Sequence, residues 1–328
     1  MKLGLAGDTM LGRKVAERLS ELGPARLFDE GLTELARSVD LLVCNLECAI
    51  SDRGEPWPDP DKPFFFRAPP VAAEVLAQLG VGCVTLANNH ALDFGPVALL
   101  DTCRHLADAG IACVGAGADE EAAHLPARLM AGGIEVAILG VTDHPSQYAA
   151  GPARPGVAFG KLGPDLPTWV HEEMAAKSAD VLLVSPHWGP NMVAAPIDRV
   201  RAAAAALLGA GASLVAGHSA HVFHGVAPRI LYDLGDFVDD YASDPELHNE
   251  LGLFWIVSFD GAEPVRVEAV PLALDYCRTR LANEDEATFI RRRFRRACAA
   301  LGTEVGEVDG RLVIDWTNTS PLAPVANS

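Results

Sequence analysis

The sequence has little positive charge for its size. Its 328 residues contain 26 Lys and Arg against 44 Asp and Glu, a formal net charge of −18. Such a chain has no basic surface to neutralise phosphate groups, which argues against nucleic-acid binding. The one dense basic run, at positions 291–296, lies in a helix-like stretch and is interpreted as a solvated helix face.

Long apolar runs are also missing. The longest, at 202–217, is rich in Ala and Gly and falls short of the roughly 18 residues that a membrane-spanning helix needs. The apolar N-terminal stretch stops at Asp8, and no small-residue cleavage site follows it. We therefore expect no membrane anchor and no secretory leader, and a cytoplasmic protein.

Cysteine is present but unpatterned. The seven cysteines are odd in number and form no C-x-x-C pair, and several lie inside apolar runs that are expected to be strands or helices. Aromatic residues make up only 6% of the chain, yet 49% of it is hydrophobic, so disorder throughout is excluded. The composition predicts reduced, buried thiols in one large domain or two closely packed ones.

Short apolar runs alternate with longer helical patterns over most of the chain. Strands are expected at 2–6, 41–45, 83–87, 112–114, 135–141, 181–186, 214–217 and 229–233. Helices are expected at 10–22, 71–79, 97–109 and 197–209. This alternation predicts an α/β fold with mostly parallel strands.

The C-terminal part has a different pattern. Two alternating runs at 253–259 and 265–271 predict an antiparallel hairpin. We expect a core domain over 1–275, a helix at 284–301 and a short hairpin near Gly310 packing on it within 276–318, and a disordered tail at 319–328. The segment 52–70, rich in Pro, Asp and Phe, is predicted to be a long ordered or lid-like loop.

Polar residues with metal-binding side chains follow the expected strands. They are Asp8, Asn45, Glu47, Asn88, Asn89, His90, His187, His218 and His221. Ligands bind at the carboxyl ends of strands in α/β sheets, so these groups should converge on one crevice. One such residue is explained as a cap or a turn, but several in register predict a site for one or two divalent metal ions.

Ordered motifs through the chain carry a family resemblance. They are Gly7-Asp8-Thr9-Met10-Leu11-Gly12-Arg13, Asn45-Leu46-Glu47, Ala87-Asn88-Asn89-His90 with Asp93 and Gly95, His187-Trp188-Gly189, Gly217-His218-Ser219-Ala220-His221 and Tyr232-Asp233-Leu234-Gly235-Asp236-Phe237. Over about residues 1–245 they resemble the CapA-type poly-γ-glutamate capsule synthesis family, a branch of the calcineurin-like metallophosphatase superfamily.

The resemblance implies a four-layer α/β/β/α metallophosphatase-like sandwich, here with a small C-terminal helix and hairpin appendage, and two metal ions between the sheets. It implies that Asp8 binds the first ion, Glu47 bridges, Asn89 binds the second, and His90 is the acid beside it. The remaining implied ligands are His187, His218 and His221. The ions would be Zn, Mn or Fe.

Two departures from the superfamily pattern affect the ligand count. Met10 stands where the first motif usually has His, and the last motif has the spacing His218-x-x-His221, which makes Ser219 a candidate ligand. Many capsule-synthesis members also carry an N-terminal membrane anchor. The expected absence of one here argues against a role in exporting or anchoring a capsule polymer.

Further residues are assigned supporting roles. Asp236 is expected to hold an imidazole N–H near the metals, and with His90 and His187 it is assigned to catalysis. Lys62, Arg67 and Asn45 are candidates for binding an anionic small-molecule or peptide substrate. His224 is interpreted as a supporting residue, and Asp143-His144-Pro145 as a strand-end turn with a second reading in which it reaches the crevice.

Three functions remain open from the sequence. The favoured one is hydrolysis of a phosphoester or amide-type bond by a metal-activated water. The first alternative is a metal-dependent epimerase that inverts a Cα centre of a peptide, as in lasso-peptide biosynthesis. The second is a non-catalytic binding protein for an acidic polymer such as poly-γ-glutamate. The oligomeric state is left undecided.

Overall fold

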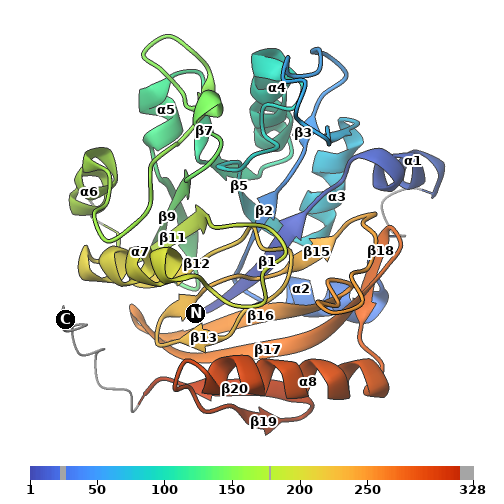
Figure 1. Ribbon diagram of the computed structural model, residues 1–328, viewed down its shortest axis with the longest axis vertical. Helices are drawn as coiled ribbons and strands as arrows, with labels where there is room; N and C mark the ends of the chain where they lie inside the picture. The colour runs from blue at the N-terminus through green and yellow to red at the C-terminus, as the bar shows by residue number, and fades with distance from the viewer. Residues whose placement is uncertain (23–26, 177–178, 318–328) are drawn as a thin grey trace.

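The computed structural model describes residues 1–22, 27–176 and 179–317. One group of strands comprises β1 (Lys2–Thr9), β2 (Leu41–Leu46), β5 (Val81–Thr85), β6 (Ala112–Val114), β15 (Asp236–Val238), β16 (Leu251–Asp260), β17 (Glu263–Asp275), β18 (Arg278–Leu281), β19 (Gly306–Val308) and β20 (Arg311–Asp315). They form one ten-stranded sheet in the order β19-β20-β17-β16-β1-β2-β5-β6, with β15 beside β1 and β18 beside β17 (Figure 1).

A second sheet of six strands faces the first. Its strands are β8 (Ala127–Ala131), β9 (Ile134–Thr142), β11 (Val181–His187), β12 (Leu214–Ala216), β13 (Val226–Ala227) and β14 (Ile230–Leu231). Their order is β13-β14-β12-β11-β9-β8. Two further pairs of short strands are β3 (Ala49–Ile50) with β4 (Arg67–Ala68) and β7 (Ala116–Gly117) with β10 (Gly156–Val157).

Helices pack around the two sheets. They are α1 (Arg13–Leu22), α2 (Glu30–Arg37), α3 (Val71–Leu79), α4 (Gly95–Asp108), α5 (Glu120–His124), α6 (Thr168–Ala175), α7 (Asp198–Gly209) and α8 (Glu284–Ala299). Apolar residues of α1 to α4 share one core with the large sheet, and those of α6 and α7 share another with the smaller sheet (Figure 1). The predicted α/β/β/α sandwich is therefore confirmed.

Alternation along the strands makes the core between the two sheets. Leu3 and Leu5 of β1 point into this core, while Ala6 points toward the helices. In β9, Val136 and Ile138 belong to the inner core, and Ala137, Leu139 and Val141 belong to the outer one. Because successive side chains of a strand face opposite ways, each sheet buries both of its faces.

Helix α8 closes one end of the inner core. Asn283 and Glu286 form a capping box at its start, which satisfies backbone amides that the first turn leaves unpaired. Ile290, Phe294 and Cys298 then follow at a spacing of four and are buried in the inner core. The hairpin of β19 and β20 continues the large sheet, because β20 pairs with β17. A domain boundary at residue 275 stays a prediction.

Most expected elements lie close to where the sequence places them, with differences at some bounds. The expected helix 10–22 begins at Arg13, because the Met10 amide still donates to Val238 O at 2.9 Å and prolongs β1. The expected strand 229–233 is limited to Ile230–Leu231. Helices α2 and α6 and strand β8 were not expected. The predicted tail at 319–328 lies outside the described residues.

The structure bears on two expectations, the state of the cysteines and the presence of membrane-spanning helices. All seven cysteines are free thiols, and five of them are buried. In the part of the chain that the structure describes, no helix combines the length and the apolar character needed to cross a bilayer.

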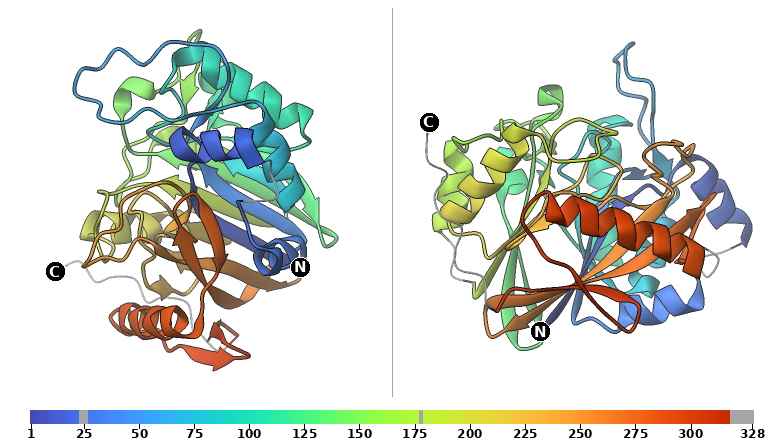
Figure 2. Two further views of the ribbon diagram at one scale, coloured as in Figure 1. Left: turned by 90° about the vertical axis from the view of Figure 1, so that its right-hand side faces the viewer. Right: turned by 60° about the horizontal axis from the view of Figure 1, so that its bottom comes forward.

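The long loop between β3 and β4 stands out from the body of the molecule (Figure 2). Its start is held by Asp101 on α4, which accepts hydrogen bonds from Ser51 Oγ at 2.7 Å and Arg53 Nε at 2.8 Å. Its end is held by Asp93, which accepts from the backbone N–H of Phe66 at 2.6 Å. Both ends of the loop are therefore fixed to the body of the molecule.

Acid should loosen the Asp101 anchor. Hydrogen bonds from Arg53 and Ser51 lower the pKa of Asp101 from its usual value of 3.8. A depressed folded-state pKa means that the stabilisation is present above pH 3.8 and is lost as the pH falls below it. We expect Asp101→Asn to destabilise the protein by about 1 kcal/mol at pH 7. The difference from wild type should shrink toward pH 3 in urea unfolding curves; a constant difference across pH would contradict this account.

Candidate metal centre

The ends of neighbouring strands bring the predicted metal-binding residues together. Asp8, near the end of β1, is in register with Asn45 of β2 on one side and Asp236 of β15 on the other. From the smaller sheet, His187 ends β11 and pairs with His218 through an isolated bridge. Each of these residues is at most 1% exposed. The chain therefore assembles one buried polar cluster from both sheets.

Gly7 allows the close packing under this cluster. A Cβ atom at Gly7 would lie 1.7 Å from the carbonyl oxygen of Gly235, which is a backbone atom that cannot turn aside. The adjacent Asp8 amide donates to the same oxygen at 2.9 Å. Only glycine fits at Gly7, and this contact fixes Asp8 against the turn that leads into Asp236.

An amide network orients the carboxylates. Asn45 Nδ2 donates to Asp8 Oδ1 at 2.8 Å and to Glu47 Oε1 at 2.9 Å. Asn45 Oδ1 in turn accepts from Asn88 Nδ2 at 2.9 Å. One oxygen of each carboxylate is thereby held in place, and the other, Asp8 Oδ2 or Glu47 Oε2, is buried without a hydrogen-bond partner.

The imidazoles are arranged in two sets. His187 Nδ1 and His218 Nδ1 lie 2.8 Å apart, close enough to share a proton, and His187 Nδ1 is 3.4 Å from Glu47 Oε1. In the other set, His221 Nδ1 lies 2.8 Å from Asp236 Oδ1 and 3.4 Å from Asp8 Oδ2. The expected contact between Asp236 and an imidazole nitrogen is thus present in the structure.

Burial perturbs every titratable group in the cluster. It raises the pKa of Asp8 and Asp236, and, together with the charge of Asp8, raises the pKa of Glu47 well above its usual range. Burial lowers the pKa of His218 to about 3. For His221, burial acts downward, but the nearby carboxylates, Asp236 foremost, raise the pKa well above its usual value. The cluster thus holds three carboxylates in a buried place, an arrangement that favours a bound cation.

The donor atoms fit a divalent metal. Five buried atoms in the cluster have no hydrogen-bond partner: Asp8 Oδ2, Glu47 Oε2, Asn89 Oδ1 and His187 Nε2, which belong to predicted ligands, and Asp236 Oδ2, which belongs to a residue expected only to hold an imidazole. Two groups of three ligand atoms each lie within 4.8 Å of one another, Asp8-His187-His218 and Asp8-His221-Asp236. Asp8 belongs to both groups. Mixed oxygen and imidazole donors suit Zn, Mn or Fe, and two adjoining groups suit one or two ions.

Met10 and Ser219, which depart from the superfamily pattern, both have hydrogen-bond partners outside the cluster. The Met10 side chain is fully buried, and its Sδ accepts from the Gly12 amide at 3.0 Å. The Ser219 hydroxyl donates to Gly189 O at 3.3 Å, and the structure places it in neither group of three. The structure therefore supplies carboxylate and imidazole donors without either residue. A ligand role for Ser219 stays a prediction.

His90 lies beside a carboxylate and an aromatic ring. Its Nδ1 is 2.8 Å from Asp93 Oδ2, and its ring stacks on Phe66 with centroids 4.1 Å apart. Lys62 Nζ contacts Asp93 Oδ1 at 2.9 Å and donates to Asn89 O at 3.0 Å. Burial, only partly offset by Asp93, lowers the pKa of His90. The loop residue Lys62 thus lies beside His90 and Asn89, and its binding of a substrate stays a prediction.

Other predicted residues are placed differently. The Arg67 guanidinium stacks on Phe94 at 4.2 Å and lies 3.4 Å from Gly54 O, so it packs between the start of its own loop and the residue that precedes α4. Asn45 is 1% exposed, and its amide is used by Asp8, Glu47 and Asn88. Substrate binding by Arg67 or Asn45 stays a prediction that this geometry does not favour. The buried His224 contacts Val193 O through Nε2 at 2.8 Å, as a supporting residue would.

Two residues had no assigned role in the sequence analysis. Asp93 contacts His90, Lys62, the Phe66 amide and, at 3.4 Å, the hydroxyl of Tyr148. Its spacing of three from His90 is the signal that could have identified it. Tyr148 lies far from the other motifs in sequence and has no signal of its own.

Comparison with known proteins gives this site its context. The family model described as bacterial capsule synthesis protein PGA_cap matches residues 2–241. A Mycobacterium tuberculosis protein named "Probable polyglutamine synthesis accessory protein" is 31% identical over 98% of this chain and 96% of its own length. The PGA biosynthesis protein CapA of Bacillus subtilis is 29% identical over 73% of this chain and 63% of its own length.

Among solved structures, a hypothetical protein from Thermus thermophilus is similar with a TM-score of 0.49 and 16% identity, over 83% of this chain and 98% of that one. The family match spans every residue of the cluster, from Asp8 in β1 to Asp236 in β15. The chain with this α/β/β/α sandwich thus belongs to the bacterial capsule synthesis protein PGA_cap family.

Proposed function

We propose that this protein is a divalent-metal-dependent hydrolase that cleaves an amide-type bond in a glutamate polymer or its precursor. The observation that carries the proposal is the set of five buried, unpartnered ligand atoms at the strand ends. Relatives named for PGA biosynthesis and polyglutamine synthesis support a glutamate polymer as substrate, and the bonds of such a polymer are amides.

The residues of the cluster and His90 have separate roles in this reaction. Asp8, Glu47 and Asp236, with His187, His218 and His221, would hold the metal, and Asn89 would add an amide oxygen. A divalent ion bound there supplies a water activated near neutral pH and polarises a carbonyl group. His90, fixed at Nδ1 by Asp93, presents Nε2 for proton transfer to the leaving amine.

Lys62 supports an anionic substrate. Its ammonium group lies between Asp93 and Asn89 O, and its side chain is 12% exposed. It thus supplies positive charge beside His90 in a chain with a net charge of −18. A carboxylate-bearing substrate needs such a group to offset repulsion from the acidic surface.

The test is a hydrolysis assay with defined metals. The protein, stripped with EDTA and reloaded with Zn²⁺, Mn²⁺ or Fe²⁺, is incubated with γ-linked glutamate oligomers and, in parallel, with phosphoesters. Metal-dependent release of primary amine supports the proposal. Phosphate release alone would indicate that the protein hydrolyses phosphoesters. Deuterium uptake at Cα without cleavage would indicate an epimerase. Polymer binding without turnover in any metal would indicate a binding protein.

A further inference from the structure

One more imidazole, that of His144, lies beside the metal cluster on the smaller sheet. His144 follows the end of β9, and its ring centroid is 5.0 Å from that of His187. The backbone around it is fixed: Asp143 N donates to His187 O at 3.1 Å, and Thr142 Oγ1 donates to His144 O at 2.6 Å. The His144 side chain is 33% exposed. The ring is therefore held beside the cluster yet open to an incoming molecule.

Asp143 determines which ring nitrogen of His144 is available. Asp143 Oδ1 lies 2.5 Å from His144 Nδ1, while Oδ2 accepts from the Arg199 guanidinium and, at 3.4 Å, from the Gly189 amide. A carboxylate with these donors around it is an acceptor, so Nδ1 carries the hydrogen. Within the described residues Nε2 has no partner, and in this tautomer it offers a lone pair.

The segment after His144 reaches across to His90. Tyr148, four residues later in a 3₁₀ turn at Ser146–Tyr148, donates its hydroxyl to Asp93 Oδ1 at 3.4 Å. Asp93 holds His90 through Nδ1 at 2.8 Å. The two imidazoles thus flank the same site, each held by its own carboxylate, one from each sheet.

We propose that His144 selects for secondary amides: its Nε2 accepts a hydrogen bond from the N–H of the bond to be cleaved. The inference rests on the proposed function and specifies its substrate class. An amide presents an N–H to this lone pair, whereas an ester or phosphoester presents an oxygen whose own lone pairs repel it. A site built to bond an N–H discriminates against analogues that lack it.

The test compares two substrates that differ in one atom. A γ-linked glutamate oligomer and the matched oligomer with an ester at the scissile bond are assayed with wild type, His144→Asn and His144→Gln. His144→Asn keeps a donor toward Asp143 but loses the acceptor at the Nε2 position. We expect kcat/KM for the amide to fall about tenfold to a hundredfold, the effect of one hydrogen bond, and kcat/KM for the ester to change less than about threefold.

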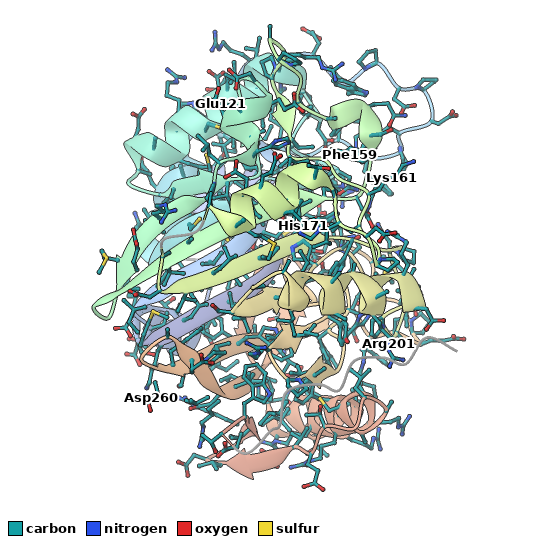
Figure 3. The ribbon with its side chains drawn as sticks, turned by 90° about the vertical axis from the view of Figure 1, so that its left-hand side faces the viewer. Glu121, Phe159, Lys161, His171, Arg201 and Asp260 are labelled. Carbon is teal, nitrogen blue, oxygen red and sulfur yellow. The ribbon has the colours of Figure 1, made fainter. Side chains whose placement is uncertain are left out.

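The glutamine variant and a distant histidine provide the controls. The amide oxygen of His144→Gln can take the Nε2 position, so it should restore most of the amide activity. His171 occupies an exposed position of α6, in the helical layer over the smaller sheet (Figure 3). His171→Ala should therefore leave kcat/KM unchanged for both substrates. Metal content is measured for every variant.

The outcomes separate the two proposals. Equal losses on amide and ester, or a loss of bound metal in His144→Asn, would overturn the selection by His144 and leave the hydrolase intact. A wild type that cleaves the ester but not the amide would overturn both the selection by His144 and the proposed cleavage of an amide. A wild type that cleaves neither would overturn the proposed function and, with it, this inference.

Discussion

Asp8→Asn should make the metal-free protein at least as stable as wild type and remove its response to metal. Burial raises the pKa of Asp8, Glu47 and Asp236, which means that folding the apoprotein buries unfavourable negative charge. An amide at position 8 removes one charge, and its oxygen can still accept from Asn45. In EDTA we expect the variant to unfold at the same temperature as wild type or a few degrees above it.

With metal bound, wild type should become more stable than Asp8→Asn. Asp8 belongs to both groups of candidate ligands, so its loss affects every site that the cluster offers. At a metal concentration about 100 times Kd, wild type should gain roughly 2.7 kcal/mol, and Asp8→Asn should gain little. Thermal unfolding with EDTA or Mn²⁺ and Zn²⁺, together with metal analysis of the purified proteins, measures both effects.

The matched control is Asp108→Asn, the same chemical change at an exposed position near the end of α4. It should leave the metal response as in wild type. If metal stabilised Asp8→Asn as strongly as wild type, the cluster at the strand ends would not be the metal site. A variant less stable than wild type in EDTA would show that Asp8 acts mainly through its hydrogen bonds.

Much of this architecture could be predicted because the chemistry coincides with regular structure. Asp8, Asn45, His187 and His218 lie at or just after the ends of apolar strands, and parallel strands bring their ends together. The helix α3 was predicted at its observed bounds, since its apolar residues form one continuous buried face. In these places local pattern and tertiary packing agree.

The rest depends on contacts between distant segments. Arg67 looks like a substrate ligand in sequence, but a cation–π contact with Phe94, 27 positions away, takes up its guanidinium group. Tyr148 reaches Asp93 only through the fold, because the two residues are 55 positions apart in the sequence. Helix α2 has eight residues and one N-cap, Asp29, which is too short a pattern to stand out. No periodicity encodes such contacts.

His90→Ala should abolish turnover while leaving the metal in place. His90 belongs to neither group of three candidate ligands, and its Nδ1 is engaged by Asp93. Loss of a positioned acid–base group lowers kcat by about 10²- to 10⁴-fold, whereas substrate affinity depends on other contacts. We therefore expect a large fall in kcat on the γ-linked glutamate oligomer, a KM within a few-fold of wild type, and unchanged metal content.

Asp93→Asn distinguishes proton transfer from simple packing of the His90 ring. The variant keeps the size of the side chain but cannot accept a hydrogen bond with both of its terminal atoms, so His90 and Lys62 compete for one oxygen. A fall in kcat at near-constant KM would assign Asp93 the task of holding the His90 tautomer. His105→Ala, on α4, should change neither constant. If His90→Ala instead raised KM at constant kcat, His90 would bind substrate rather than move a proton, and the acid would have to be sought among the other imidazoles of the cluster.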